Sequence, residues 1–372
     1  MKVEFYRHAL GEEEKNEVLK TLEGTFLTAG PRTQAFEAAF SAYFGFGHTV
    51  GLNSCTAALH LGLLALGIGK GDEVIVPAMT FIASATAVMH VGAKPVLVDV
   101  DPSTGLIDPQ AVLKALTSRT KAIMPVHLYG QLAPMKELRE IADRHSLKLI
   151  EDSAHCISGK EGEIRPGSLG DAACFSFYAT KNITSGEGGA LLTKDPEVAA
   201  QVRMLRTHGM SKEAGDRYSK QYVHWDMVAA GWKYNMFDLQ AALLLPQVPK
   251  IDSYSAARER VALRYEAAFS KNARLDFPKM RCGYADRHLF TLWVPKERRD
   301  DLLNELYTKG VGVAVNFRAI HLLTYFRETY GYQRGDFPHA ELIGDRTLSL
   351  PFYTGLKDEE IGYVIQQVFD CL

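Results

Sequence analysis

The sequence predicts an α/β fold in which a mainly parallel sheet is covered by helices on both faces. From residue 48 onward, short and mainly apolar runs such as 172–177 alternate with longer amphipathic segments such as 134–145. Apolar runs of this kind are typical of strands buried on both sides, and the alternation is typical of strands joined by helices. In such sheets, ligands bind outside the carboxyl ends of the strands, so functional residues are expected to follow strands.

The elements of this fold can be taken in order along the chain. Helical periodicity over residues 11–23 and 34–43 predicts two helices before the sheet begins. Strands are then expected at 48–52, 73–76, 95–99, 121–126, 147–150, 172–177 and 189–193, with helices between them at 55–66, 80–91, 109–117 and 134–145.

The C-terminal part of the chain repeats the alternation on a smaller scale. A long helix is expected from Met236 to about Ser270. We therefore predict a large domain of residues 1–245 and a small α/β domain of residues 246–372, joined by this helix. Within the small domain, strands are expected at 289–294, 311–315 and 348–353, and helices at 298–309 and 358–369.

The composition excludes several classes of protein. Lys plus Arg number 42 against 44 for Asp plus Glu, so no basic excess predicts a nucleic-acid or membrane-surface partner. The five cysteines form no CxxC pair and no metal-ligand spacing, which suits a reducing compartment. No signal-peptide pattern and no apolar run of membrane-spanning length occurs. We expect a cytoplasmic enzyme without a metal.

Lys181 is the first candidate for chemistry. It lies between the apolar run 172–177 and a glycine-rich turn that contains Gly186, Gly188 and Gly189. A lysine at the mouth of a buried strand is poorly solvated, which lowers its pKa and makes the amine a usable nucleophile. An isolated lysine is more often a surface side chain. The residues discussed next favour the functional interpretation.

Two polar residues follow the strand at 147–150. Asp152 stands where a ligand at the sheet edge would lie, and a carboxylate there can keep a heteroaromatic nitrogen protonated. Enzymes that use pyridoxal phosphate (PLP) need such a group, because the protonated pyridine ring accepts electrons. The alternative is an aspartate that caps the following turn. His155 could contact the ring of such a cofactor, or be an ordinary hydrogen-bonded histidine.

An anion site is predicted where the strand at 48–52 meets the next helix. The turn contains Ser54, Cys55 and Thr56, and a helix N-terminus offers unpaired N–H groups and a favourable dipole. The hydroxyls could equally be plain N-caps. Ser176, in a buried strand, needs a partner such as a phosphate oxygen or a backbone carbonyl. Phe81 could stack on an aromatic cofactor or belong to the core.

With these motifs in view, the chain resembles the DegT/StrS sugar aminotransferases. The similarity runs from about residue 10 to the C-terminus, with the motifs in the usual order, and it is carried by the runs NSCTAALHLGLLALGIGKGDEVIVPAMTF, IEDSAHC, FSFYATKNITSGEGGA and GWKYNMFDLQAAL. Members of this family are PLP enzymes of fold type I that aminate keto groups on nucleotide-linked sugars. The runs EDSAH, WKYN and NFRAIH are most similar to the subgroup that makes UDP-4-amino-4-deoxy-L-arabinose by aminating C4 of a 4-keto sugar.

The resemblance implies a role for each candidate residue around the cofactor. Lys181 would hold PLP as a Schiff base and then move the proton between substrate and cofactor. Asp152 would pair with the pyridinium nitrogen, His155 would lie beside the ring, and Phe81 would stack on it. The phosphate would be bound by Cys55, Thr56 and Ser176, and by Lys233 and Asn235 reaching in from a neighbouring subunit, so a homodimer with shared active sites is implied.

The substrates implied are L-glutamate and a nucleotide-linked keto-sugar, with Asn316, Arg318 and His321 as the residues that would contact the sugar nucleotide. The chain departs from the usual pattern at Cys55, where many relatives have Gly, and at Asn316, where His is common. It has Lys233 and Asn235 where many relatives have Asn and Arg, so the residue that contacts phosphate is left open. Alternatives are a 3-keto sugar aminotransferase, a PLP-binding regulator and a dehydratase, although dehydratases of the family replace the lysine at Lys181 by His.

Overall fold

The computed structural model describes residues 1–211, 224–281 and 283–372. It confirms the α/β fold, with a seven-stranded sheet in the order β1-β7-β6-β5-β4-β2-β3. Five of these strands, β2 to β6, form parallel pairs with one another, and β7 runs antiparallel to both of its neighbours. The strands are β1 His48–Leu52, β2 Glu73–Pro77, β3 Lys94–Val98, β4 Thr120–Ile123, β5 Lys148–Asp152, β6 Ala172–Ser176 and β7 Gly189–Thr193.

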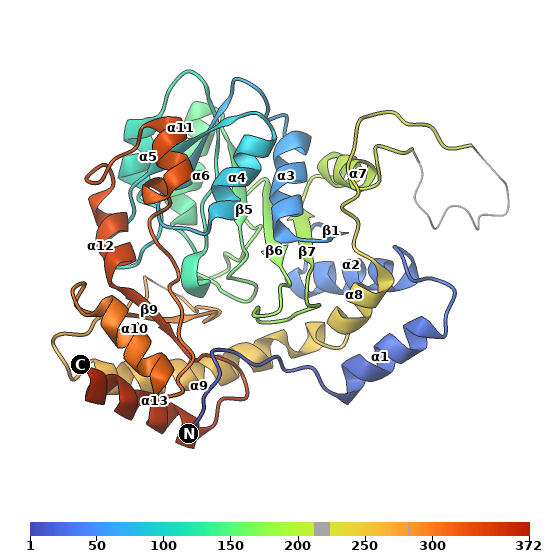
Figure 1. Cartoon of the computed structure of the whole chain (residues 1–372). Coiled ribbons are helices and arrows are strands. Elements are labelled where there is room, and N and C mark those ends of the chain that lie inside the picture. The colour runs from blue at the N-terminus through green and yellow to red at the C-terminus, as the bar shows by residue number, and fades with distance from the viewer. Residues whose placement is uncertain (212–223, 282) are drawn as a thin grey trace.

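Helices cover both faces of this sheet, as Figure 1 shows. One face carries α3, α4 and α7, and the other carries α2, α5, α6 and α8. Most of these helices connect successive strands, as the sequence pattern predicted. The helices up to β8 are α1 Glu12–Leu22, α2 Pro31–Phe44, α3 Cys55–Ala65, α4 Ile82–His90, α5 Pro109–Ala115, α6 Met135–His145, α7 Pro196–Leu205, α8 Asp238–Leu244 and α9 Ile251–Phe269.

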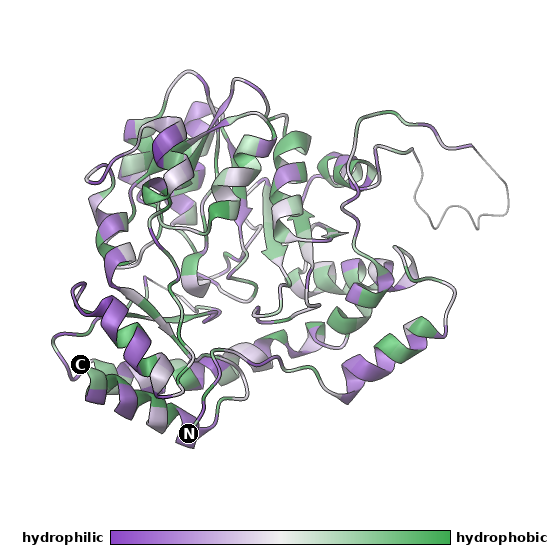
Figure 2. Ribbon diagram, in the orientation of Figure 1, coloured by the Kyte–Doolittle hydropathy of each residue, from purple (hydrophilic) through white to green (hydrophobic). Residues whose placement is uncertain are grey.

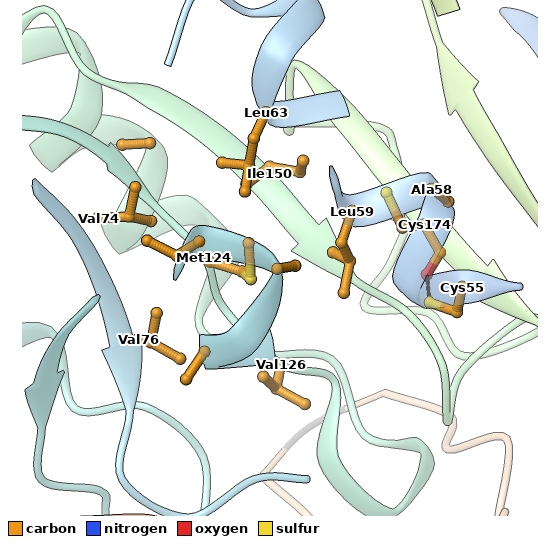
Figure 3. Close-up of a cluster of buried hydrophobic side chains, with 14 of the residues drawn as sticks. Cys55, Ala58, Leu59, Leu63, Val74, Val76, Met124, Val126, Ile150 and Cys174 are labelled. Atoms are coloured by element: carbon orange, nitrogen blue, oxygen red, sulfur yellow. Dashed lines mark hydrogen bonds between the residues drawn. The ribbon is translucent and has the colours of Figure 1, made fainter. Parts of the chain in front are cut away.

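The strands are apolar throughout because each face of the sheet has its own core. In β6, Cys174 faces the core beneath α3, while Ala173 and Phe175 face the aromatic core beneath α2 and α8. Successive side chains of a strand point to opposite faces, so a strand covered on both sides needs an apolar residue at every position. Figure 2 shows the central strands and α3 as hydrophobic, and Figure 3 shows Leu59 and Leu63 of α3 among the strand side chains.

A second, two-stranded sheet organises the C-terminal part of the chain. Its strands pair antiparallel, with Phe290 opposite Leu350, and pack with α9, α10 and α13 around a separate core that also contains Val3 from the N-terminus. The remaining elements are β8 Phe290–Trp293, α10 Arg299–Thr308, α11 Thr324–Tyr330, α12 Pro338–Arg346, β9 Thr347–Leu350 and α13 Asp358–Cys371.

Two sequence predictions for this part are wrong. The expected long helix from Met236 to Ser270 is divided into α8 and α9, because Pro246 and Pro249 interrupt the backbone hydrogen bonds of a continuous helix. The expected strand at 311–315 is not formed, and the segment makes only isolated bridges at Val311 and Ala314. In addition, α7, α11 and α12 were not expected from the sequence. The domain boundary at residue 245 stays a prediction.

The described part of the chain contains no helix that is long and apolar enough to cross a membrane. Within the same residues, no group of three or more His, Cys, Asp or Glu side chains is arranged to hold a metal ion. Four cysteines of this part are buried thiols, and Cys282 lies outside the described residues.

Candidate active site

The predicted cofactor residues gather at the carboxyl ends of the strands of the large sheet. Asp152 ends β5 and Ser176 ends the adjacent β6. Cys55 begins the helix that follows β1, and Phe81 lies four residues after the end of β2. The expectation that functional candidates follow strands is therefore confirmed for these positions.

Lys181 lies in the connection between β6 and β7. The base of this connection is closed by backbone hydrogen bonds from Phe177 N–H to Gly188 O (2.8 Å) and from Ser185 N–H to Phe177 O (3.0 Å). The next residue, Gly189, passes directly under the start of α3, where a Cβ atom would lie 2.3 Å from the carbonyl carbon of Ser54. Only glycine permits this approach, and it brings the helix N-terminus beside the lysine connection.

The amine of Lys181 is poorly solvated, as the sequence predicted. Burial lowers its pKa to about 8, and the nearby Cys55 and Asp152 act in the opposite direction. At neutral pH a usable fraction of this amine is unprotonated, unlike that of a surface lysine. Its Nζ lies 3.4 Å from Nε2 of His288.

Asp152 is buried and held by two donors. Ser84 of α4 donates its hydroxyl to Oδ2 (2.7 Å), and the backbone N–H of Ala154 donates to Oδ1 (3.0 Å). Ser84 in turn shares a hydrogen bond with the hydroxyl of Thr80 (2.8 Å). Burial raises the pKa of Asp152, while the Ser84 and Ala154 hydrogen bonds and the charge of Lys181 lower it. The carboxylate thus has a fixed orientation at the end of β5.

The start of α3 has the form of an anion site. Ser54 is the N-cap and accepts a hydrogen bond from Ala57 N–H (3.1 Å), so it leaves the backbone N–H groups of Cys55 and Thr56 uncapped at the first turn. The thiol of Cys55 turns away to the carbonyl of Cys174 (3.4 Å), as Figure 3 shows.

Ser176 has a backbone partner, but it is a donor rather than the carbonyl considered from the sequence. Its Oγ accepts a hydrogen bond from Tyr178 N–H (3.4 Å). A hydroxyl that accepts from a backbone N–H still has its own proton to donate, so Ser176 remains able to bind an anion.

A row of rings forms one wall of the site. The exposed ring of Phe81 contacts Phe317 (5.6 Å between centroids), Phe317 stacks on His155 (5.7 Å), and His155 contacts His288 (4.4 Å). His155 accepts a hydrogen bond from Tyr129 N–H at Nδ1 (3.4 Å), and burial followed by the charge of Lys181 holds its pKa well below the usual range. His155 is therefore a neutral ring in this wall.

The predicted contacts to the sugar nucleotide lie in different surroundings. Asn316 precedes Phe317, and its backbone carbonyl accepts a hydrogen bond from the Tyr129 hydroxyl (2.9 Å). Arg318 is exposed, whereas His321 is fully buried and its Nε2 faces a carboxylate oxygen of Glu341 at 3.0 Å. No contact joins Arg318 or His321 to Lys181 among the described residues, and their roles stay predictions.

The two residues predicted to act across a dimer also differ in exposure. The side chain of Lys233 is exposed, and its backbone carbonyl accepts a hydrogen bond from Asn53 (3.4 Å). Asn235 is buried, forms a bridge with Leu52 at the end of β1, and donates from Nδ2 to Met236 O (3.1 Å). Both residues lie beside β1 of their own chain. Their contribution to the active site of a partner subunit stays a prediction.

Sequence reasoning missed Ser84, Phe317 and His288. Ser84 lies four residues after Thr80, at helical spacing behind a strand end, and this pattern was a usable signal. His288 comes from a segment without regular structure more than a hundred residues beyond Lys181, and no local pattern marks it.

Comparison with known proteins decides the family. The sequence pattern of the DegT/DnrJ/EryC1/StrS aminotransferase family matches residues 8–369. The chain belongs to this family. Aminotransferases of the family bind pyridoxal phosphate, so the fold, enzyme class and cofactor expected from the sequence are confirmed.

Individual relatives support this assignment along the whole chain. The spore coat polysaccharide biosynthesis protein SpsC of Bacillus subtilis (strain 168) is 42% identical over 370 residues, covering 98% of this chain and 95% of SpsC. The structure of the proposed sugar aminotransferase Spr1654 from Streptococcus pneumoniae, in its PMP form, matches with a TM-score of 0.94 and 32% identity, over 100% of this chain and 99% of that one. DesV of S. venezuelae, solved with a ketimine intermediate, matches with a TM-score of 0.91 and 35% identity over 99% and 98% of the two chains.

Proposed function

We propose that this aminotransferase moves the amino group of L-glutamate to C4 of a nucleotide-linked 4-keto sugar. The observation that carries the proposal is the placement of Asp152 at the end of β5 and of Lys181 in the connection that follows the adjacent parallel strand β6. There the amine has a pKa of about 8 and the carboxylate has a fixed orientation. An amine that is partly unprotonated at neutral pH, beside a buried carboxylate, suits proton transfer at a carbon next to a nitrogen.

The residues at this sheet edge fit pyridoxal phosphate. The buried carboxylate of Asp152 suits a pyridinium nitrogen. Burial disfavours the negative charge of this carboxylate, and a positively charged nitrogen beside it would offset that cost. The uncapped N–H groups at the start of α3 suit a phosphate. When bound, the cofactor supplies an aldehyde that reacts with amines and a ring that accepts electrons.

Each residue then has a separate task in the proposal. Lys181 would hold the cofactor covalently through Nζ, and its free amine would take and return the proton at the reacting carbon. Asp152 keeps a proton on the ring nitrogen, and Ser84 holds the carboxylate in place. His155 and Phe81, both in the row of rings that includes Phe317, would pack against the cofactor ring and help to exclude water.

We assign the phosphate to Cys55 and Thr56, through their backbone N–H groups, and to the hydroxyl of Ser176. The proposal also includes a homodimer in which Lys233 and Asn235 complete the partner's phosphate site. Exposed apolar side chains at Trp225, Met227 and Val228 precede the segment that carries these two residues, which supports an interface there.

The substrate assignment is supported by the relatives and by the motifs of the chain. SpsC is a polysaccharide biosynthesis protein, and a structure that matches with a TM-score of 0.92 and 26% identity is PseC of Helicobacter pylori, an aminotransferase involved in the biosynthesis of pseudoaminic acid. We propose an amino sugar for a cell-surface glycan, made in the cytoplasm, with Asn316, Arg318 and His321 toward the sugar nucleotide. The preference for C4 over C3 comes from the EDSAH and NFRAIH runs at residues 151–155 and 316–321.

The test begins with the visible absorption spectrum of the purified protein, loaded with PLP, before and after L-glutamate is added. We expect a yellow protein whose colour fades with L-glutamate. Nucleotide-linked 4-keto and 3-keto sugars are then compared by how fast each restores the colour. Restoration by 3-keto sugars alone would overturn the C4 assignment. A yellow protein that responds to no amino donor would overturn the transfer reaction itself.

A further inference from the structure

Lys181 forms a hydrogen bond with His288, a residue that has no role in the function proposed above. Its Nζ lies 3.4 Å from Nε2 of His288, which lies two residues before β8 in the C-terminal part of the chain. The imidazole is buried, and its ring lies tilted against that of His155 at 4.4 Å between ring centroids. In a neutral imidazole one ring nitrogen donates a hydrogen bond and the other accepts one. The effect of His288 on the reactive amine therefore depends on which nitrogen carries the proton.

The neighbours of His288 determine which nitrogen carries the proton. The side-chain Nδ2 of Asn182 donates to the backbone carbonyl of Asp286 (3.0 Å), which can only accept, so the amide oxygen of Asn182 is the atom that faces Nδ1 of His288 (3.3 Å). An amide oxygen also only accepts, so the proton of the neutral ring lies on Nδ1. Nε2 then carries a lone pair and accepts the hydrogen bond that Nζ of Lys181 donates.

The ring is held neutral and in one orientation. Burial, followed by the charge of Lys181 and by the neighbouring His155 and Arg258, holds the pKa of His288 well below its usual range. Its backbone N–H donates to the carbonyl of Tyr129 (3.3 Å), the residue whose own N–H is bound by His155. The two side-chain distances are long for hydrogen bonds, as is common at catalytic sites before a ligand binds.

We propose that His288 is a positioning residue for Lys181, and that its unprotonated Nε2 holds the lysine amine at the reacting centre whenever Nζ is not bonded to the cofactor. A lysine side chain has a long, flexible stem, and one acceptor at a fixed place limits where its amine can go. Asn182 fixes the tautomer that makes this possible. The effect of His288 on turnover rests on the proposed transfer reaction. The contact between His288 and Lys181 does not depend on that reaction.

The other groups that face Lys181 set the direction of the expected effect. Asp152 from β5 and Cys55 from α3 favour the charged amine, and His155 is neutral. An acceptor such as Nε2 of His288 also favours the charged form, because an ammonium donates more strongly than an amine. Removing the acceptor therefore lowers the pKa of Lys181 further, and we expect a fall of about one pH unit, or a tenfold change in proton affinity.

The first experiment measures this pKa in the protein freed of cofactor, so it does not depend on any activity. Lys181 is labelled with trace acetic anhydride across a pH series and quantified by mass spectrometry, with the exposed Lys148 as internal reference. In His288→Phe the labelling midpoint is expected to fall by about one unit. His288→Gln keeps a donor for Asn182 and an acceptor for Lys181, so its midpoint should equal that of the unaltered protein.

His60→Phe is the matched control, because His60 is also buried and its ring nitrogens have no partner within the described part of the chain. It should leave the midpoint of Lys181 unchanged. A midpoint in His288→Phe that stays or rises, with the protein folded, would overturn the proposal. Equal falls in His288→Phe and His288→Gln would do the same, since they would indicate a purely structural role for the ring.

The second experiment uses the loaded enzyme. His288→Phe should lower kcat about tenfold with little change in KM for the amino donor, and His288→Gln should restore most of the rate. Loss that appears mainly in KM, or that Gln does not restore, would contradict a positioning role. If the unaltered protein itself transfers no amino group, the proposed function fails, while the labelling result still decides the contact between His288 and Lys181.

Discussion

Replacing Asp152 by Asn tests the proposed centre most directly, because the hydrogen-bond network around it can be kept. The amide oxygen of the new side chain can still accept from Ala154 N–H, the donor that now holds Oδ1 of Asp152 at 3.0 Å. Its NH2 group can donate to the hydroxyl of Ser84, which then donates to Thr80, since either hydroxyl of that pair can be the donor. The variant should therefore fold.

The expected magnitudes for stability and rate differ widely. With both neighbours still paired, the free energy of unfolding should change by less than about 1 kcal/mol. Removing the charged partner of a buried pyridinium should cost about 3–5 kcal/mol, the usual penalty for breaking a buried ion pair from one side. At about 1.4 kcal/mol for each factor of ten, turnover should fall roughly 10²- to 10⁴-fold.

The assay is the rate at which L-glutamate removes the colour of the PLP-loaded protein, measured by stopped flow alongside thermal unfolding. Asp171→Asn is the matched control: Asp171 accepts a hydrogen bond from Leu149 N–H (2.7 Å) but precedes β6, at the opposite edge of the sheet. It should leave the rate per folded molecule unchanged. If Asp152→Asn retains turnover within about tenfold of the unaltered protein, the role assigned to Asp152 is wrong.

Four further changes test the rest of the site. Lys181→Ala should bind PLP without a covalent bond and lose all turnover; covalent cofactor found by mass spectrometry after borohydride treatment would contradict the assignment. Mixed dimers of Lys181→Ala with Lys233→Ala chains should regain one functional site in two, and no regain would argue against contribution across the dimer. Gly189→Ala should lower the unfolding temperature by several degrees, because its Cβ would lie 2.3 Å from Ser54, whereas Gly355→Ala, with nothing within 4 Å, should not. Since only the unprotonated amine reacts, covalent reconstitution with PLP should speed up with rising pH and level off above about 8, the pKa of Lys181; a pH-independent rate would show that the amine is not limiting.

The large sheet could be predicted from the sequence because both of its faces are covered. A strand such as β6 must then be apolar at every position, which gives a signal that needs no knowledge of its neighbours. The C-terminal part gave weaker signals. The segment 311–315 is as apolar as a strand, yet it forms only isolated backbone bridges, from Val311 to Val3 and from Ala314 to Ser349.

The residues of the candidate site that follow strands of the large sheet could be predicted from the sequence. Asp152 and Lys181 follow strands of that sheet, so strand assignment alone brings them together. His288 reaches Lys181 from a segment before β8, and nothing in its neighbouring residues indicates a functional histidine. The family resemblance named Arg318 and His321 instead, from the NFRAIH run at residues 316–321. The position of His288 depends on how the C-terminal part of the chain packs against the large sheet. The periodicity of the sequence carries no information about that packing.

That placement rests in part on backbone contacts with the loop after β4, besides the hydrogen bonds from Ile157 and Ser158 to the carboxylate of Asp286. Asp286 N–H donates to Gly130 O (2.8 Å) and His288 N–H donates to Tyr129 O (3.3 Å), so the loop after β4 binds the segment before β8 on both sides of Arg287. Gly130 has φ of +95°, and a Cβ there would lie 2.6 Å from the backbone nitrogen of Arg287. Any side chain at Gly130 must therefore push the segment outward, and His288 moves with it, while Asp152 is held separately by donors from α4 and its own turn. A substitution at Gly130 should for this reason separate the two functions of the site: the bond between Asp152 and Ser84 would survive, and the contact between His288 and Lys181 would be lost.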